Sequence, residues 1–208
     1  MEQMNEENKK LAFEMGQAGW IIPGGIARGD VFFVMANVLK EVEIHKENRQ
    51  WQDMDTYFQS MYIELFTMKD CHWLKIFIED IKNVLEEMNL SRIFEQAIEA
   101  YWHELYIPCV YTMIPLFEGT LSIVSGYSGT NMKRSFDNLL RKKDLPYYEK
   151  YNIEGFINSL TENKNFKEDS EPDRVNRHWL LHGRSTKDIK MADCIKLINA
   201  LKFLTDFL

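Results

Sequence analysis

The stretch LKIFIEDIKNVLEEM, residues 74 to 88, carries the clearest structural pattern of this 208-residue chain. Its apolar residues recur every three or four positions, and its charged residues fall between them. This repeat matches the 3.6-residue period of an α-helix that packs against a core with one face. The apolar positions are Leu74, Phe77, Ile78, Ile81, Val84, Leu85 and Met88.

Two more segments have the same spacing, one on each side of this stretch. The first runs from residue 54 to 65 and the second from residue 194 to 208, and we expect each helix to dock by one face. A further helix is predicted from Gly29 or Asp30 to about Val42. The apolar positions of the two flanking segments are Met54, Tyr57, Phe58, Met61, Tyr62, Leu65, Cys194, Leu197, Ile198, Leu201, Leu204 and Leu208.

The middle of the chain predicts two more helices. Ser91 is the expected N-cap of a helix to about Tyr106, with Glu95 in its first turn. The next helix, from about Pro108 to Gly126, is bulky on all sides, so it is predicted to be the most buried element. The chain has only ten Gly and five Pro, which is few for the turns of an all-β fold. The sequence therefore predicts an all-α, multi-helix up-and-down bundle.

Composition and charge narrow the class of protein. The net charge of −7 argues against a protein that coats nucleic acid through a global positive field, although a local basic site stays open. No run of 18 uninterrupted apolar residues occurs, and the charged first ten residues do not resemble a signal peptide. The three cysteines lie far apart and form no CxxC pair. We therefore expect a cytoplasmic protein with reduced thiols and no membrane association.

Motifs for metals and cofactors are missing. His103 and Glu104 begin an HExxH-like segment, but Ile107 stands where the second histidine is needed. No glycine-rich phosphate loop and no paired cysteine ligands occur. We expect no metal and no cofactor.

The octapeptide NRHWLLHG, residues 176 to 183, is the strongest candidate for chemistry. Arg177 and His182 are separated by four residues, and both can reach one ligand if Arg177 lies at the start of a helix. Arginine offers a charged fork for phosphate oxygens, and histidine exchanges protons near pH 7. Together they suffice for phosphodiester cleavage by an adjacent 2′-OH, which requires proton transfer and charge stabilisation.

A structural explanation of the octapeptide stays open beside this one. An R-x4-H spacing occurs often by chance, and the segment can also be read as a polar helix cap. The density of polar groups favours a site, because Arg174 and Arg184 flank the octapeptide closely. The basic run that contains Lys133 and Arg134 has two readings as well, an RNA-guiding surface and a solvated helix face.

The octapeptide, the preceding acidic loop and the Leu-rich end of the chain resemble the HEPN superfamily. Its motif, an arginine, a polar residue and a histidine after four to six positions, matches Arg177, His178 and His182. The segments AIEAY, from residue 97, and LFEG, residues 116 to 119, are similar to bacterial HEPN-like proteins of the abortive-infection kind. The resemblance covers about residues 91 to 208, which implies a HEPN-like domain there and an N-terminal helical extension over residues 1 to 90.

The resemblance implies a metal-independent endoribonuclease that works as a homodimer and leaves a 2′,3′-cyclic phosphate, for example a toxin or phage-defence effector. Arg177 and His182 would be the catalytic residues, and Glu118 would orient Arg177, unless it forms only a structural ion pair. The alternatives are a non-catalytic HEPN module that binds nucleotide, RNA or a protein partner, and a purely structural helical dimer. The expected supporting residues are Glu118, Asn176, His178 and Gly183, and the expected RNA or phosphate ligands are Arg174, Arg184, Lys133 and Arg134.

Overall fold

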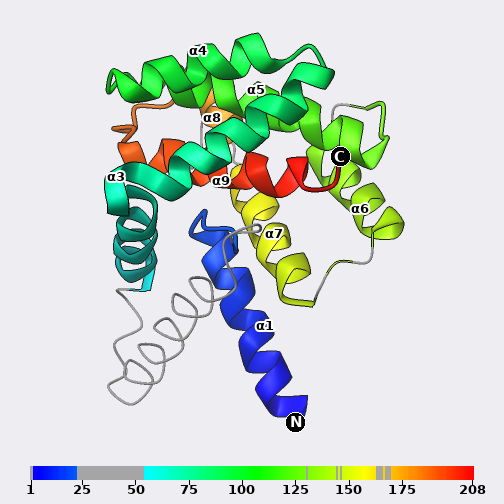
Figure 1. Cartoon of the computed structure of the whole chain (residues 1–208). Helices are drawn as coiled ribbons and strands as arrows, with labels where there is room; N and C mark the ends of the chain where they lie inside the picture. Colours follow the sequence, from blue (N-terminus) through cyan, green and yellow to red (C-terminus); the bar gives the residue numbers. More distant parts are fainter. Residues whose placement is uncertain are drawn as a thin grey trace.

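A computed structural model describes residues 2–22, 54–129, 131–143, 145, 147–162, 166 and 170–208. In this part of the chain the structure has eight helices and no strands, so the predicted all-α bundle is confirmed (Figure 1). The helix predicted from Asp30 to Val42 lies outside the described residues. The helices are α1 (Glu2–Gln17), α3 (Met54–Glu87), α4 (Ser91–Trp102), α5 (Tyr106–Ser125), α6 (Met132–Lys142), α7 (Tyr147–Leu160), α8 (Arg177–Leu181) and α9 (Met191–Thr205).

The C-terminal helix α9 lies at the centre of the bundle, where it packs against both α3 and α5 (Figure 1). Helix α4 packs against α3 and α5, and α6 packs against α5 and α7. Helix α1 lies along α7. The short helix α8 rests on α5 and thereby carries the octapeptide onto that helix.

The predicted one-sided docking of the C-terminal segment is wrong, because α9 is buried nearly all round. Every residue from Met191 to Thr205 except Met191 and Lys196 is buried. One buried polar side chain of this helix bonds across the bundle: the amide nitrogen of Asn199 donates a 2.6 Å hydrogen bond to the Ile21 carbonyl oxygen. Leu208 lies beyond the end of the helix and is 57% exposed.

The boundaries of α4 and α5 correct the sequence prediction in two ways. Leu90, not Ser91, is the N-cap of α4, no side chain caps it, and no acidic residue lies in its first turn, so Glu95 is not part of it. Helix α4 ends at Trp102, and α5 begins at Tyr106. Pro108 therefore falls in the first turn of α5, where its missing N–H removes no helical hydrogen bond. Gly126 ends α5 in the left-handed conformation, as predicted.

Helix α3 contains a sharp break between the two segments that the apolar pattern identifies. Lys69, Asp70 and Cys71 all have positive φ, from 51° to 59°, and Met68 is extended. Left-handed backbone is unfavourable for residues with a side chain, at a cost of about 1 to 2 kcal/mol each. The break lets the second half of α3 pack against α4 and α9 in a new direction.

Helix α5 is buried on one side only, so the prediction that it is the most buried element is also wrong. From Ile107 onward, its residues that are not fully buried all fall within a sector of about 160° at the helical spacing of 100° per residue. By length and composition alone α5 is long and apolar enough to cross a membrane, yet half of its most apolar stretch is buried in the bundle. A core helix passes the same test, and the absence of membrane association stays a prediction.

One hydrophobic cluster joins the described helices. It includes Met15 of α1, Leu74 of α3 and Leu201 of α9. The division into residues 1–90 and 91–208 stays a prediction, and helices from both ranges contribute to this cluster. Cys109 and Cys194 are buried, Cys71 is half-buried, and none forms a disulfide, in agreement with the expected thiols.

Candidate functional site

The octapeptide forms a short helix whose two ends are held by its own residues. Asn176 is the N-cap of α8, and its side-chain oxygen accepts a hydrogen bond from the backbone N–H of Trp179 at 3.2 Å. The amide nitrogen of the same side chain donates to the Glu162 carbonyl oxygen at 2.9 Å. Gly183 follows the helix with φ of +64°, in the left-handed region that favours glycine. Asn176 thus caps the start of α8 and Gly183 follows its end, while their role as supporting residues of a site stays a prediction.

Arg177, the first residue of α8, is bound by Glu118 from the middle of α5. Its Nε donates to one carboxylate oxygen of Glu118 at 2.9 Å and an Nη donates to the other at 2.8 Å. The side chains are 32% and 20% exposed, respectively, so the pair is only partly screened by solvent. Such a two-point contact fixes the plane of the guanidinium as well as its position. The structure therefore contains a Glu118–Arg177 contact of the kind that the resemblance implies, and the orienting role of Glu118 in catalysis stays a prediction.

Two histidines and an aromatic ring form a cluster beside this ion pair. The rings of His178 and His182 lie 4.7 Å apart at 73°. Phe166 stacks on His178 with the ring centres 4.4 Å apart and the planes nearly parallel. The same ring meets His182 at 5.7 Å and Trp179 at 5.1 Å, both edge to face. The Arg184 guanidinium lies 4.7 Å from the centre of the Phe166 ring.

The environment of His178 favours its neutral form. Burial lowers the pKa of His178 below its ordinary value, and the charges of His182 and Arg177 lower it further. His178 is therefore neutral at pH 7 and offers one donor and one acceptor nitrogen. Both predicted catalytic residues therefore lower the pKa of His178.

Arg177 and His182 lie at opposite ends of α8. Arg177 is its first residue and His182 is its C-cap, so the helix that separates them is about 7.5 Å long. His182 is exposed, whereas Arg177 is half-buried. The arrangement thus provides an immobilised cation and an accessible imidazole on one short element.

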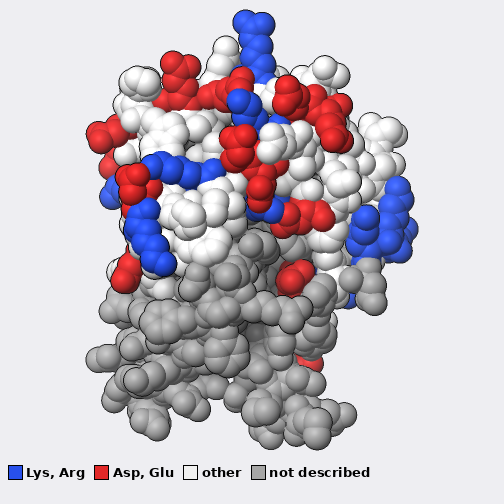
Figure 2. All heavy atoms as spheres, viewed as in Figure 1, with Lys and Arg blue, Asp and Glu red and all other residues white. Residues whose placement is uncertain are grey.

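The four predicted RNA or phosphate ligands lie in three places. Only Arg184 joins the histidine cluster. Lys133 and Arg134 are exposed on α6, and a group of Lys and Arg side chains lies over that helix at the right of Figure 2. No hydrogen bond, ion pair or ring contact among the described residues connects their side chains to Arg177 or His182. Their role in RNA binding stays a prediction.

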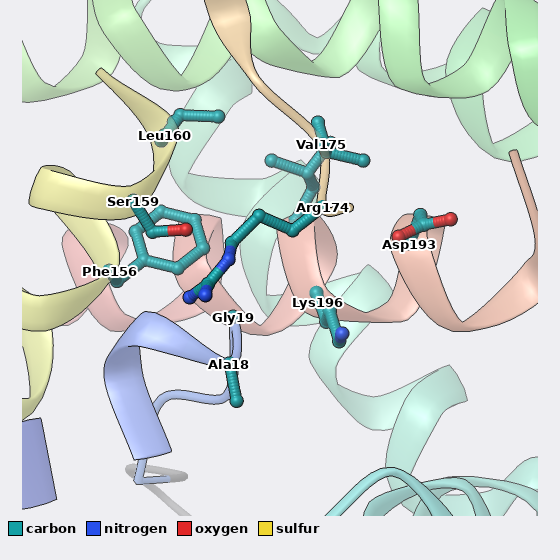
Figure 3. Close-up of a pocket in the computed structure, with 10 residues that line it drawn as sticks. Ala18, Gly19, Phe156, Ser159, Leu160, Arg174, Val175, Asp193 and Lys196 are labelled. Atoms are coloured by element: carbon teal, nitrogen blue, oxygen red, sulfur yellow. The ribbon is translucent and has the colours of Figure 1, made fainter. Parts of the chain in front are cut away.

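Arg174 is turned away from the cluster, toward the end of α1. It donates a hydrogen bond to the Gln17 carbonyl oxygen and lines a pocket with Gly19, Phe156 and Lys196. Figure 3 shows its side chain lying across this pocket, near Phe156 and Gly19. Because its guanidinium already binds a backbone carbonyl, this contact gives Arg174 a structural role. Phosphate binding by Arg174 stays a prediction.

The sequence does not reveal Phe166, although its ring touches four side chains of the site. It lies in a polar loop with little apolar content, residues 161 to 173, and a single aromatic residue there shows no periodicity. The same loop is tied to the segment after α8 by Glu171, which accepts hydrogen bonds from Ser185 and from the backbone and hydroxyl of Thr186. Burial raises the pKa of Glu171, but these hydrogen bonds outweigh it and lower the pKa below its ordinary value.

Among the described residues, no group of three or more His, Cys, Asp and Glu side chains is arranged to hold a metal ion. No protein-family model, no curated protein and no solved structure matches this chain.

Proposed function

We propose that this protein is a metal-independent endoribonuclease of HEPN type, with Arg177 and His182 as its catalytic residues. One observation carries the proposal: a guanidinium fixed at two points by Glu118 lies on the same short helix as an exposed histidine. A structural ion pair alone would not require a histidine pair beside it. The proposed place of action is the cytoplasm, where the protein would work as a toxin or phage-defence effector.

The proposed reaction is an attack of a ribose 2′-OH on the adjacent phosphate. A base takes the proton of the 2′-OH, the P–O5′ bond breaks, and an acid protonates the leaving 5′-oxygen, which leaves a 2′,3′-cyclic phosphate. His182 suits the proton transfers because an imidazole can both accept and donate a proton. Arg177 suits the charge stabilisation: Glu118 occupies two of its five N–H groups, so three remain for phosphate oxygens.

The proposed enzyme is a homodimer, because the reaction needs a base and an acid at once. Two copies of His182 facing one phosphate would supply both from a single sequence position. The exposed sector of α5 supports this assembly, since it combines apolar residues with Glu118, the partner of Arg177. Ile107 and Ile123 in this sector are 55% and 52% exposed. A second copy that covers this face would bring two octapeptides near a common axis.

The decisive experiment is RNA cleavage in EDTA with mixed-sequence RNA. We expect wild-type protein to produce fragments with 2′,3′-cyclic phosphate ends, and Arg177→Ala and His182→Ala to abolish cleavage with unchanged melting temperatures. His103→Ala is the matched control, because His103 is an exposed histidine at the end of α4, where its ring bonds only the Glu99 carbonyl oxygen. Cleavage that persists in His182→Ala, or that requires a divalent metal, would count against the proposal.

A second candidate is a non-catalytic HEPN module that binds RNA, nucleotide or a protein partner. The acidic net charge of −7 and the packing of Phe166 over both histidines favour it. This candidate predicts binding without turnover, weakened by the Arg177 and His182 substitutions. A purely structural role for these residues predicts instead that the substitutions lower the melting temperature or change nothing.

A further inference from the structure

A guanidinium lies over the ring of Phe166. The guanidinium of Arg184 lies 4.7 Å from the ring centre, and Arg184 is exposed. No carboxylate among the described residues forms an ion pair with it. A cation–π contact at an exposed position favours the closed arrangement by a factor of only about 2 to 5. Arg184 can therefore leave the ring at little cost when a better partner arrives.

The Phe166 ring also contacts His182, one of the two proposed catalytic residues. The ring centres of Phe166 and His182 are 5.7 Å apart, and Phe166 is stacked on His178 on the same helix. A flat group that replaces the guanidinium would stack on the same Phe166 ring that His182 meets edge to face. The nucleotide that carries such a group would then be anchored one ring away from His182.

A nucleobase is a stronger partner for an aromatic ring than an exposed guanidinium. Removing the aromatic partner of a stacked base weakens binding about 5- to 150-fold, compared with the factor of 2 to 5 for the arginine contact. The displaced Arg184 would then be free to bind a phosphate with its fork of N–H donors. A base within a duplex is already stacked on its neighbours and cannot make this exchange.

We infer that Phe166 and Arg184 form a subsite for one unpaired base of single-stranded RNA, on the ring that also contacts His182. The inference rests on the proposed function for the nature of the ligand, and it makes the substrate single-stranded. The base takes the place of the Arg184 guanidinium over the Phe166 ring, and Arg184 turns to a phosphate of the same strand.

The test is a binding measurement that does not depend on cleavage. Fluorescence anisotropy would give the Kd of full-length protein for a labelled 2′-O-methyl RNA strand, which lacks the attacking hydroxyl, and for its duplex. We expect Phe166→Leu to weaken single-strand binding about 5- to 150-fold and to leave duplex binding unchanged. Phe166→Trp, which keeps an aromatic face, should retain wild-type affinity. Phe207→Leu is the matched control, because Lys143 lies over the Phe207 ring at 5.9 Å in another part of the molecule.

Arg184→Gln provides a second measurement that does not alter the ring. Loss of one phosphate contact should reduce the slope of log Kd against log salt by about 0.7 for a single strand. If Phe166→Leu lowers the melting temperature strongly, the salt slope of Arg184→Gln tests the subsite in its place.

Several results would overturn the inference: equal loss of single-strand and duplex binding in Phe166→Leu, an equal effect of Phe207→Leu, an unchanged salt slope in Arg184→Gln, or no binding of either RNA. Its failure is distinguishable from that of the proposed function. Normal cleavage by Phe166→Leu would contradict the proposed base subsite, but the proposed ribonuclease activity would stand. Phe166-dependent binding of an RNA that the protein never cleaves supports the subsite and counts against the ribonuclease.

Discussion

At the scale of single residues, the contact between Glu118 and Arg177 controls where the cation points. In Glu118→Gln an amide replaces the carboxylate, so at most one of the two hydrogen bonds to Arg177 can persist and the charge pairing is lost. Because both side chains are partly exposed, we expect the free energy of unfolding to fall by only about 1 kcal/mol. The melting temperature should then drop by about 2 to 4 °C.

The same substitution should reduce kcat much more than stability, because a misplaced catalytic group loses about 10- to 100-fold in rate. Glu99→Gln is the matched control, since Glu99 is an exposed carboxylate on α4 without an ion pair among the described residues. Thermal unfolding and cleavage rates measured on both variants check the prediction. If Glu118→Gln keeps wild-type kcat, Glu118 does not orient Arg177 for catalysis, whatever it contributes to the fold.

The sequence predicts those residues of the site whose role depends on their own chain neighbours, and misses those whose contacts are distant in sequence. Asn176 and Gly183 act within their own helix, so their cap and left-handed positions follow from local chemistry. Glu118 stands out because a carboxylate in an apolar helix needs a cation. Phe166 and Arg174 make contacts with residues distant in sequence or across an irregular loop, and no local pattern encodes those contacts.

At the scale of elements, the break in α3 predicts whether a glycine substitution there raises or lowers the free energy of unfolding. Lys69 is exposed and has φ of 51°, so glycine should relieve the left-handed strain there. We expect Lys69→Gly to raise the free energy of unfolding by about 0.5 to 1 kcal/mol, after the added entropy of the unfolded glycine. Glu64→Gly, at an exposed position in the regular first half of α3, should lower it by a similar amount. Urea denaturation of both variants checks the prediction, and destabilisation by Lys69→Gly would mean that α3 is continuous.

Apolar periodicity located the halves of α3 but misjudged α9 and α5. A helical wheel treats polar residues as solvent-facing, so it cannot foresee that Asn199 binds the Ile21 carbonyl oxygen or that the buried Lys202 side chain pairs with the exposed Asp206 at the end of α9. Bulky residues all round suggested complete burial of α5, but burial depends on the number of neighbouring helices. The surplus apolar surface of α5 is therefore left exposed beside Glu118.

At the scale of the whole molecule, the bundle holds α8 against α5 and leaves His182 and one sector of α5 exposed to solvent. Helix α5 packs against α4, α6 and α9 with its buried side and carries Glu118 at the edge of its exposed sector. The acidic net charge does not attract RNA at long range, so the local cations Arg177 and Arg184 must supply the attraction to phosphate. Assembly of two copies would double that local positive charge, so a dimer should bind RNA more tightly than a monomer.

Gly119 offers a way to test whether the exposed sector of α5 is the interface of the proposed homodimer. A Cβ built on Gly119 meets nothing within 4 Å, so a single copy can accommodate a long side chain there. Replacing a helical glycine should even stabilise the monomer, by about 0.5 to 1 kcal/mol. Within a packed two-fold interface, however, Gly119→Arg would place two cations and two long side chains against each other.

We therefore expect sedimentation to show a dimer for wild type and a monomer with lost RNase activity for Gly119→Arg. The control Asn83→Arg, at an exposed position of α3, should stay dimeric. A Gly119→Arg variant that remains dimeric would place the interface elsewhere, and a monomeric wild type with full activity would remove the two-copy mechanism.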